Sequence, residues 1–443
     1  MTFSTEQLAE AVDGVLVGDA TIQCSGGAID SRQCETGNVF FAIKGEFADG
    51  HDFIHAAIEA GCSAVVVERA IQARVPVVQV EDVRKSLLAL AMFHRAGFHS
   101  TKVIAITGSV GKTTTKDMIA TMLGQGAVAS PKSFNNDLGV PLTILAAEDA
   151  DYLVAEVGAN AIGEIKPLAQ LVQPDISVLT SIESAHLEGF GDQKTVLAEK
   201  AKLLEELPST GIAILPEGID LSPFDIKATI CRVGHSENAD IQIKTGISSL
   251  GYAPLQIADD EITLSLLGEH NAWNAALAIV ACMHGNPTLS KEELMRIVSS
   301  IMPSPGRLQV LDLNGITFID DSYNANPASM RTALELFQVM QGKRRVMILG
   351  DMLELGESSH TEHRLLGSAI ERVGADIVVL VGEQMKITSQ VTSSIYEFEC
   401  SEDALKRISS LLKQGDMVLL KGSRGMRLER VMELKRQAKV STL

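Results

Sequence analysis

The chain has 443 residues, a formal net charge of −18 and 46% hydrophobic residues. This length favours about three domains, and the composition is typical of a soluble globular protein with substantial cores. The negative charge argues against nonspecific nucleic-acid binding, so we expect no nucleic-acid partner. No apolar run approaches the about 20 residues that a membrane helix needs, and the N-terminus lacks the features of a signal peptide. We therefore expect a cytoplasmic protein without stable membrane insertion.

The first predicted unit, residues 1–82, is a small α/β domain with short strands. Ser4 and Gln7 suit the capping box of a first helix, and residues 53–60 are helical in pattern. The predicted strands of this unit are 38–43, 63–67 and 75–80.

The second predicted unit, residues 83–310, alternates apolar strands with helices. This alternation indicates a mostly parallel sheet with helices on both faces. Its predicted strands are 103–106, 152–157 and 176–180, and its predicted helices are 83–96, 162–171, 192–207, 270–283 and 290–301. In residues 211–267 short β-like segments take the place of the strand–helix alternation. They predict a smaller antiparallel patch appended to the sheet. These segments are 212–215, 239–245 and 262–266.

The most informative stretch is Thr-Gly-Ser-Val-Gly-Lys-Thr-Thr-Thr-Lys at residues 107–116. It follows the apolar run at 103–106 and leads into helical spacing, an arrangement that cradles a nucleotide phosphate. Lys112 can reach the outer phosphates, and the Thr113 hydroxyl can ligate Mg²⁺. The general pattern has its first glycine where this chain has Ile106, so the loop is a shorter variant.

After a hinge-like turn at 303–306, strands and helices alternate again in a third unit, residues 311–443. This unit is predicted to be a second doubly wound, Rossmann-like domain. Its predicted strands are 317–319, 345–349, 377–381 and 417–420, and its predicted helices are 328–341, 361–373, 402–413 and 426–437. The expected fold is therefore α/β in three domains, with a central P-loop-type, mostly parallel sheet domain.

Polar residues follow the strands that come after the phosphate loop. Glu156 ends one strand, which places it in the ligand crevice of a doubly wound fold. Mg²⁺ prefers carboxylates together with phosphate oxygens, so Glu156 is a candidate metal ligand, against the alternative of a solvated strand end. His186 follows the next predicted strand and is therefore expected in the same ligand crevice. The loop at 134–141, with Asn135 and Asn136, either holds substrate or is a plain turn.

Several motifs together resemble the Mur ligase family, and the resemblance covers almost the whole chain. The shortened phosphate loop is one of these motifs. The matching segments are 30–32, 41–53, 107–116, 135–141, 156–160, 186–190, 267–275, 305–307, 320–327, 349–356 and 421–426.

The resemblance implies an ATP-dependent ligase that forms an amide bond through an acyl phosphate. The implied partners are UDP-MurNAc-tripeptide and D-alanyl-D-alanine, in the synthesis of peptidoglycan precursors, and the enzyme is expected to be a monomer. The chemistry is consistent with this expectation. A carboxylate is a poor electrophile, so a phosphate leaving group must be installed, and the charges of the two anions must be neutralised.

The resemblance also implies roles for individual residues. The implied catalytic residues are Lys112, His186 and Lys200. The implied ligands of two Mg²⁺ ions are Thr113, Glu156, His186 and Lys200, the last as a carbamate. The implied ATP-binding residues are Gly108, Ser109, Val110, Gly111, Lys112, Thr113, Thr114, Asn271, Asn274, Arg307 and Asp321. The implied substrate-binding residues are Ser31, Arg32, Lys44, Asn135, Asn136, Tyr323, Asn324 and Asn326. Lys202 is the alternative to Lys200, whose spacing from His186 fits the family better.

Three other functions compete with this hypothesis. A ligase that adds the third amino acid to UDP-MurNAc-dipeptide usually carries an Asp-Asn-Pro-Arg-like motif, which the sequence lacks, whereas residues 321–327 match the dipeptide-adding type. A folate polyglutamate ligase would have no place for the N-terminal unit. An ATP-binding switch protein would need no second metal site. The sequence does not distinguish lysine from diaminopimelate in the tripeptide.

Overall fold

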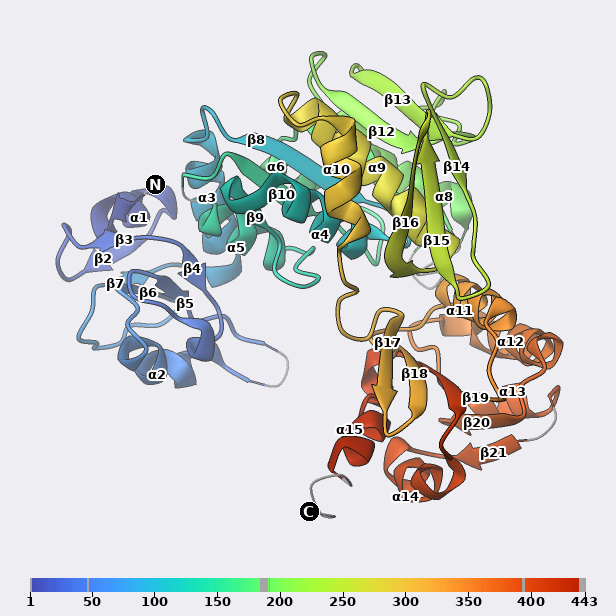
Figure 1. Ribbon diagram of the computed structural model, residues 1–443. Helices are drawn as coiled ribbons and strands as arrows, with labels where there is room; N and C mark the ends of the chain where they lie inside the picture. The colour runs from blue at the N-terminus through green and yellow to red at the C-terminus, as the bar shows by residue number, and fades with distance from the viewer. Residues whose placement is uncertain are drawn as a thin grey trace.

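The computed structural model describes residues 2–45, 48–147, 149–183, 190, 192–392 and 395–437. Figure 1 shows three lobes that follow one another along the chain, with the central lobe between the N-terminal and C-terminal lobes. Each lobe is built on its own main sheet, of five, nine and six strands respectively. Within these described residues, no helix is long and apolar enough to cross a membrane.

The N-terminal lobe has a five-stranded sheet in the order β2-β7-β6-β5-β4, and β1 pairs separately with β3. Ser4 and Gln7 form the predicted capping box, because each side chain bonds the backbone N–H of the other residue. The elements are β1 Phe3–Ser4, α1 Thr5–Ala11, β2 Val15–Val17, β3 Gln23–Cys24, β4 Gly27–Ala28, β5 Val39–Phe41, α2 Ile54–Glu59, β6 Ala64–Val67 and β7 Val77–Gln79.

The central lobe has a nine-stranded sheet in the order β16-β15-β14-β13-β12-β11-β8-β10-β9. Its strands are β8 Lys102–Thr107, β9 Ala127–Ala129, β10 Tyr152–Glu156, β11 Ile176–Leu179, β12 Ile212–Pro216, β13 Thr229–Gly234, β14 Ile241–Thr245, β15 Tyr252–Ile257 and β16 Asp260–Leu267. Its helices are α3 Val83–Ala96, α4 Lys112–Leu123, α5 Gly139–Ala146, α6 Ile165–Val172, α8 Gln193–Glu205, α9 Glu269–Gly285 and α10 Lys291–Ser299.

Alternate residues of the central strands pack into two separate cores, as expected for a parallel sheet buried on both faces. Val103 and Ala105 of β8 belong to a core that also includes residues of α3, α5 and α6. Ile104 and Ile106 belong to a second core with α4, α9 and α10. The prediction of helices on both faces of this sheet is confirmed.

The predicted antiparallel patch at 211–267 is smaller than expected. β12, β13 and β14 extend the parallel sheet, and only β15 and β16 run antiparallel to their neighbours. The sequence pattern was misleading because residues 217–228 connect β12 to β13 without a helix. Parallel strands are usually joined by a helical crossover, so that signal was missing here.

Helix α3 packs against both the N-terminal lobe and the central lobe. It contacts β5 and β6 on one side and α5 on the other. Leu87 and Leu90 are fully buried in a core that also contains Phe41 and Leu145, one from each lobe. The boundary after residue 82 stays a prediction, since the apolar core is continuous across it.

The C-terminal lobe has a six-stranded sheet in the order β17-β18-β22-β19-β20-β21, in which only β17 is antiparallel to its neighbour. Its strands are β17 Gln309–Leu313, β18 Ile316–Asp321, β19 Arg344–Gly350, β20 Ile377–Val381, β21 Ile395–Phe398 and β22 Asp416–Lys421. Its helices are α11 Pro327–Val339, α12 Ser359–Val373, α13 Met385–Ser389, α14 Ser401–Leu411 and α15 Arg430–Gln437. This is the predicted Rossmann-like alternation.

Candidate active site

A cleft of about 1040 Å³ is lined by residues of the central lobe, the 303–307 turn and the C-terminal lobe. Strand order explains its position. β10 and β11 flank β8, with Glu156 opposite Ile106 and Leu179 opposite Thr107. The carboxyl ends of three parallel strands therefore meet at one edge of the sheet, where a doubly wound fold binds its ligand.

The phosphate loop has glycine at two positions that tolerate no larger residue. Gly108 and Gly111 have φ angles of 148° and 86°, in the region that favours glycine. A Cβ atom at Gly108 would lie 2.0 Å from the Thr180 Oγ1, and one at Gly111 would lie 2.3 Å from the Asn274 Oδ1. These glycines thus permit both the bend of the loop and its close packing.

Lys112 begins α4 and folds back over the phosphate loop. Its Nζ donates to the carbonyl oxygens of Gly108, at 2.7 Å, and Ser109, at 3.2 Å. Burial lowers the pKa of Lys112, the Glu156 carboxylate opposes this shift, and the positive Arg307 adds to it. The ammonium therefore lies against the phosphate loop, and its role toward a phosphate stays a prediction.

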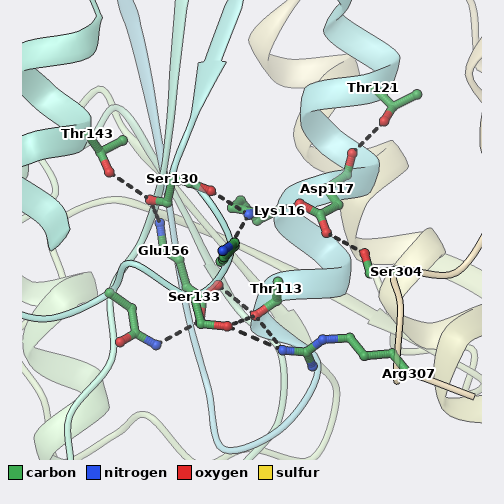
Figure 2. Close-up of polar contacts among 12 residues, drawn as sticks. Thr113, Lys116, Asp117, Thr121, Ser130, Ser133, Thr143, Glu156, Ser304 and Arg307 are labelled. Carbon is green, nitrogen blue, oxygen red and sulfur yellow. Dashed lines mark hydrogen bonds and ion pairs between the residues drawn. The ribbon is translucent and has the colours of Figure 1, made fainter. Parts of the chain in front are cut away.

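Thr113 and Glu156 form the polar centre of the site (Figure 2). The Thr113 hydroxyl donates to the Glu156 Oε2 at 2.8 Å, and the Asn135 amide donates to the Oε1 at 2.8 Å. Glu156 is 1% exposed, and its backbone N–H donates to the Ser130 hydroxyl. A carboxylate and a hydroxyl beside a phosphate loop are the oxygen ligands that Mg²⁺ prefers.

Arg307 reaches this centre from the turn that leads to the C-terminal lobe. Its Nη2 donates to the Thr113 Oγ1 at 3.2 Å and to the Ser133 Oγ at 3.3 Å. The guanidinium also lies over the Tyr323 ring, 4.3 Å from the centroid, and the Tyr323 hydroxyl lies 3.0 Å from the Ser133 Oγ. Figure 2 shows Arg307 beside Thr113 and Ser133. With Tyr323, residues of both lobes therefore meet at the phosphate loop.

Lys200 and Lys202, the two lysines considered for a carbamate, have different surroundings on α8. Lys200 is 1% exposed, and its pKa is lowered to about 7 by burial and by the charge of Lys112, against the opposing Glu199. Lys202 is partly exposed and pairs with Glu199. Burial thus favours Lys200, as the sequence analysis did. His186 lies outside the described residues.

The first turns of α9 also line the cleft. Asn271 and Asn274 line the cleft, and the Asn274 amide donates to the Asn271 Oδ1 at 3.1 Å. His270 and Trp273 line it too. Burial and the positive Lys421 lower the pKa of His270 to about 4, so this ring is neutral at neutral pH.

The C-terminal lobe contributes a buried ion pair to the cleft. The Lys421 Nζ donates to the Asp321 Oδ2 at 2.6 Å and to the Asn324 carbonyl at 3.0 Å. Tyr323, Asn324 and Asn326 also line the cleft, and Asn326 caps α11. The structure therefore brings all three predicted substrate residues of this lobe to the cleft.

Four other predicted substrate residues do not line this cleft. Ser31, Arg32 and Lys44 belong to the N-terminal lobe, where Arg32 is largely exposed and forms a two-point ion pair with Asp30. The Asn136 side chain accepts from backbone N–H groups at the start of α5. The substrate roles of these four residues stay predictions.

Ser133 and Lys421 belong to the site, although sequence reasoning assigned a role to neither. Ser133 is a single hydroxyl in a loop, and no local pattern marks it. Lys421 ends the apolar strand β22 and is 1% exposed. A charged residue directly after an apolar run was the available signal, since lysines are seldom buried without a partner.

The fold and the site define a class: a phosphate-loop protein whose separate C-terminal lobe contributes to the same nucleotide-sized cleft. Comparison with known proteins identifies the family. The chain matches the Mur ligase family, catalytic domain, over residues 24–95, the Mur ligase middle domain over 106–282, and the Mur ligase, glutamate ligase domain over 306–424. The chain belongs to the Mur ligase family, and it is a ligase.

Curated relatives match almost the whole chain. Proteins named UDP-N-acetylmuramoyl-tripeptide–D-alanyl-D-alanine ligase from Bacillus subtilis and Haemophilus influenzae are 32% and 33% identical, with 97% of each chain covered. A crystal structure of MurF from Acinetobacter baumannii has a TM-score of 0.87 at 31% identity, covering 98% of this chain and 99% of that one. MurF ligase from Thermotoga maritima in complex with ADP has a TM-score of 0.80 at 28% identity, covering 95% and 99%.

Proposed function

We propose that this protein joins D-alanyl-D-alanine to UDP-MurNAc-tripeptide and converts ATP to ADP and phosphate. The observation that carries the proposal is the meeting of Lys112, Thr113, Glu156 and Arg307 at one phosphate loop that faces the C-terminal lobe. Full-length similarity to ligases of that name supports the choice of substrates.

The first step transfers the γ-phosphoryl group of ATP to the terminal carboxylate of the tripeptide. The bond between the γ-phosphorus and the bridging oxygen breaks, a carboxylate oxygen bonds to that phosphorus, and ADP leaves. Both reactants are anions, so the positive side chains of Lys112 and Arg307 lower the cost of bringing them together. Their positions at the loop suit them to that task.

The second step forms the amide. The amine of D-alanyl-D-alanine attacks the carbonyl carbon of the acyl phosphate, loses a proton, and phosphate departs with its oxygen. Water competes with the amine for the acyl phosphate, so a cleft that closes between lobes favours the amide product. Tyr323, Asn324 and Asn326 contribute the C-terminal wall of that cleft.

We infer that the site takes two magnesium ions. Thr113 and Glu156 would hold one ion, and His186 together with a carbamate on Lys200 would hold the other. Bound Mg²⁺ supplies neutralisation of phosphate charge. A carbamate forms when the neutral Lys200 amine adds to the carbon of CO₂ and loses a proton, and a pKa near 7 leaves much of this amine neutral at physiological pH. We place the enzyme in the cytoplasm, as a monomer.

A substrate panel tests the proposed reaction. The purified protein is incubated with ATP, Mg²⁺, either the lysine or the diaminopimelate tripeptide nucleotide, and several dipeptides, and products are identified by mass spectrometry. We expect a pentapeptide nucleotide that depends on D-alanyl-D-alanine, and no product from the Lys112→Ala variant. ADP release that is independent of both substrates would refute the ligase assignment for this pair.

A further inference from the structure

Helix α4 carries a buried cation behind the phosphate loop. Lys116 is 2% exposed, and its Nζ donates to the carbonyl oxygens of Ser130, at 2.6 Å, and Lys132, at 2.9 Å. The same ammonium lies 2.8 Å from the Asp117 Oδ1. Removing an ammonium from water is unfavourable unless such partners replace the water. The consequence is a fixed backbone just before Ser133.

Asp117 extends this arrangement to the turn between the lobes. Its Oδ2 accepts a hydrogen bond from the Ser304 Oγ at 3.1 Å, although the two residues are 187 positions apart. The Ser304 carbonyl in turn accepts from the backbone N–H of Arg307 at 3.1 Å. The carboxylate on α4 is therefore connected through one residue to the backbone that carries the guanidinium (Figure 2).

The contacts of Lys116 and of Asp117 lead to two side chains that meet at the site. Lys116 holds the backbone that leads to Ser133, and the Asp117–Ser304 bond holds the turn that leads to Arg307. Ser133 and Arg307 then meet, at 3.3 Å, and Arg307 also touches the Thr113 hydroxyl. A packing role alone would not require a buried charge whose contacts, with the 130–132 backbone and with Asp117, both lead to the phosphate loop.

We propose that Lys116 and Asp117 are positioning residues, which link the phosphate-loop helix to the interdomain turn and set the position of Arg307 beside the phosphates of ATP. The inference rests on the proposed use of ATP and adds how the turn between the lobes is held. Lys116 and Asp117 act through Ser133, Ser304 and Arg307, and touch no phosphate themselves.

The test measures whether the Asp117–Ser304 bond acts through Arg307. Ser304→Ala removes the hydroxyl and leaves the Lys116–Asp117 pair intact. Binding of a non-hydrolysable ATP analogue is followed by the fluorescence of Trp273, the single tryptophan of the chain, which lines the cleft. We expect Ser304→Ala to weaken binding about fivefold, the effect of one lost hydrogen bond. Ser304→Thr, which keeps the hydroxyl, should restore binding.

The decisive comparison repeats Ser304→Ala in an Arg307→Ala background. If Ser304 acts only by positioning Arg307, Ser304→Ala should not weaken analogue binding further when Arg307 is already alanine. The effects of substituting two residues that act through one interaction do not add. Lys116→Met should likewise weaken analogue binding in the parent protein but not in the Arg307→Ala background. If Lys116→Met unfolds at a lower urea concentration than the parent, the comparison of Ser304→Ala with and without Arg307→Ala decides whether the contacts act through Arg307.

Thr121→Ala is the matched control on the same helix. The Thr121 hydroxyl bonds the Asp117 carbonyl at 2.7 Å and does not reach the turn, so analogue binding should be unchanged. Equal losses from Ser304→Ala with and without Arg307, or no loss in either chain, would overturn the proposal. Analogue binding does not depend on the acceptor substrate, so failure of the proposed D-alanyl-D-alanine reaction would appear only in the mass-spectrometric panel.

Discussion

The Thr113 hydroxyl donates to the Glu156 carboxylate at 2.8 Å, across 43 positions of sequence. The contact exists because β10 lies beside β8, which brings the end of one strand to the loop after the other. A carboxylate that is 1% exposed needs hydrogen-bond donors or cations in place of the water it has lost, and this one has donors on both oxygens. Such a pair is well arranged to exchange its internal hydrogen bond for a metal ion.

Asn135→Ala should reduce the apparent affinity for Mg²⁺ by about 10- to 100-fold, the usual effect of losing a partner that orients a metal ligand. Glu156→Gln should reduce this affinity at least as much. The measurement is the Mg²⁺ concentration that gives half-maximal ADP release. Glu10→Gln alters an exposed carboxylate of α1 and serves as the control. An unchanged Mg²⁺ requirement in Glu156→Gln would remove this residue from the metal site.

The pKa of Lys200 predicts a specific dependence of stability on pH. Burial and the charge of Lys112 lower this pKa from 10.5 to about 7, with Glu199 opposing. Between these values the unfolded chain binds a proton that the folded chain lacks, so stability at this residue rises with pH. Below pH 7 both states are protonated, and the full destabilisation remains.

Lys200→Met should remove this pH dependence of the free energy of unfolding, which is roughly 1.4 kcal/mol per pH unit between the two pKa values. The free energy of unfolding is measured in urea for both proteins, from about pH 6.5 to about pH 9.5, in buffers free of CO₂. The stability gained from the substitution should be largest at the lowest pH and shrink as the pH rises. A gain that is constant with pH would show that Lys200 titrates near its ordinary value.

Chemical rescue tests the carbamate on Lys200. Lys200→Ala should reduce turnover strongly, and short carboxylic acids should restore part of it, because a carboxylate replaces the oxygen ligands of the carbamate in the space left by the side chain. Lys202→Ala is the comparison, since Lys202 lies on the same helix and pairs with Glu199. Its activity should not respond to added acid. Equal responses of the two variants would assign the acid effect to something other than a carbamate.

Tyr323→Phe should weaken closure of the cleft while keeping the aromatic contact with Arg307. The substitution removes the hydroxyl that lies 3.0 Å from the Ser133 Oγ, which is a contact between the two lobes. Small-angle X-ray scattering with ATP analogue and nucleotide peptide should show compaction of the parent protein and less compaction of the variant. Tyr396→Phe changes a tyrosine beside Arg407 within the C-terminal lobe and should compact like the parent.

Local patterns predicted most of the secondary structure. The predicted helix at 83–96 and the predicted strand at 377–381 coincide with α3 and β20. The periodicity of apolar residues was less informative where tertiary contacts decide the secondary structure. The loop predicted at 134–141 is interrupted by α5, which begins at Gly139, and the strands β13 and β15 were not predicted. Both strands lie inside the sheet, but their sequences give weak strand signals, because Arg232 and Gly234 interrupt β13 and Pro254 lies within β15.

The same division holds for the candidate site. Gly108, Gly111, Lys112 and Thr113 were predictable because a phosphate loop requires its glycines and its lysine at fixed spacing within one segment. Ser133 and Ser304 were not, since each acts through partners far away in the chain. Motif resemblance supplied Glu156 and Arg307, but not the distances between them and Thr113.

The sequence by itself determined the strand, glycine loop and helix of the phosphate site, because backbone conformation at Gly108 and Gly111 is a local requirement. It also determined three successive α/β units, through the periodicity of apolar residues. Only the tertiary structure decided that β10 lies beside β8, that Lys200 rather than Lys202 is buried, and that Arg307 reaches Thr113. Those relationships depend on strand order and lobe packing, and neither is a property of any single segment.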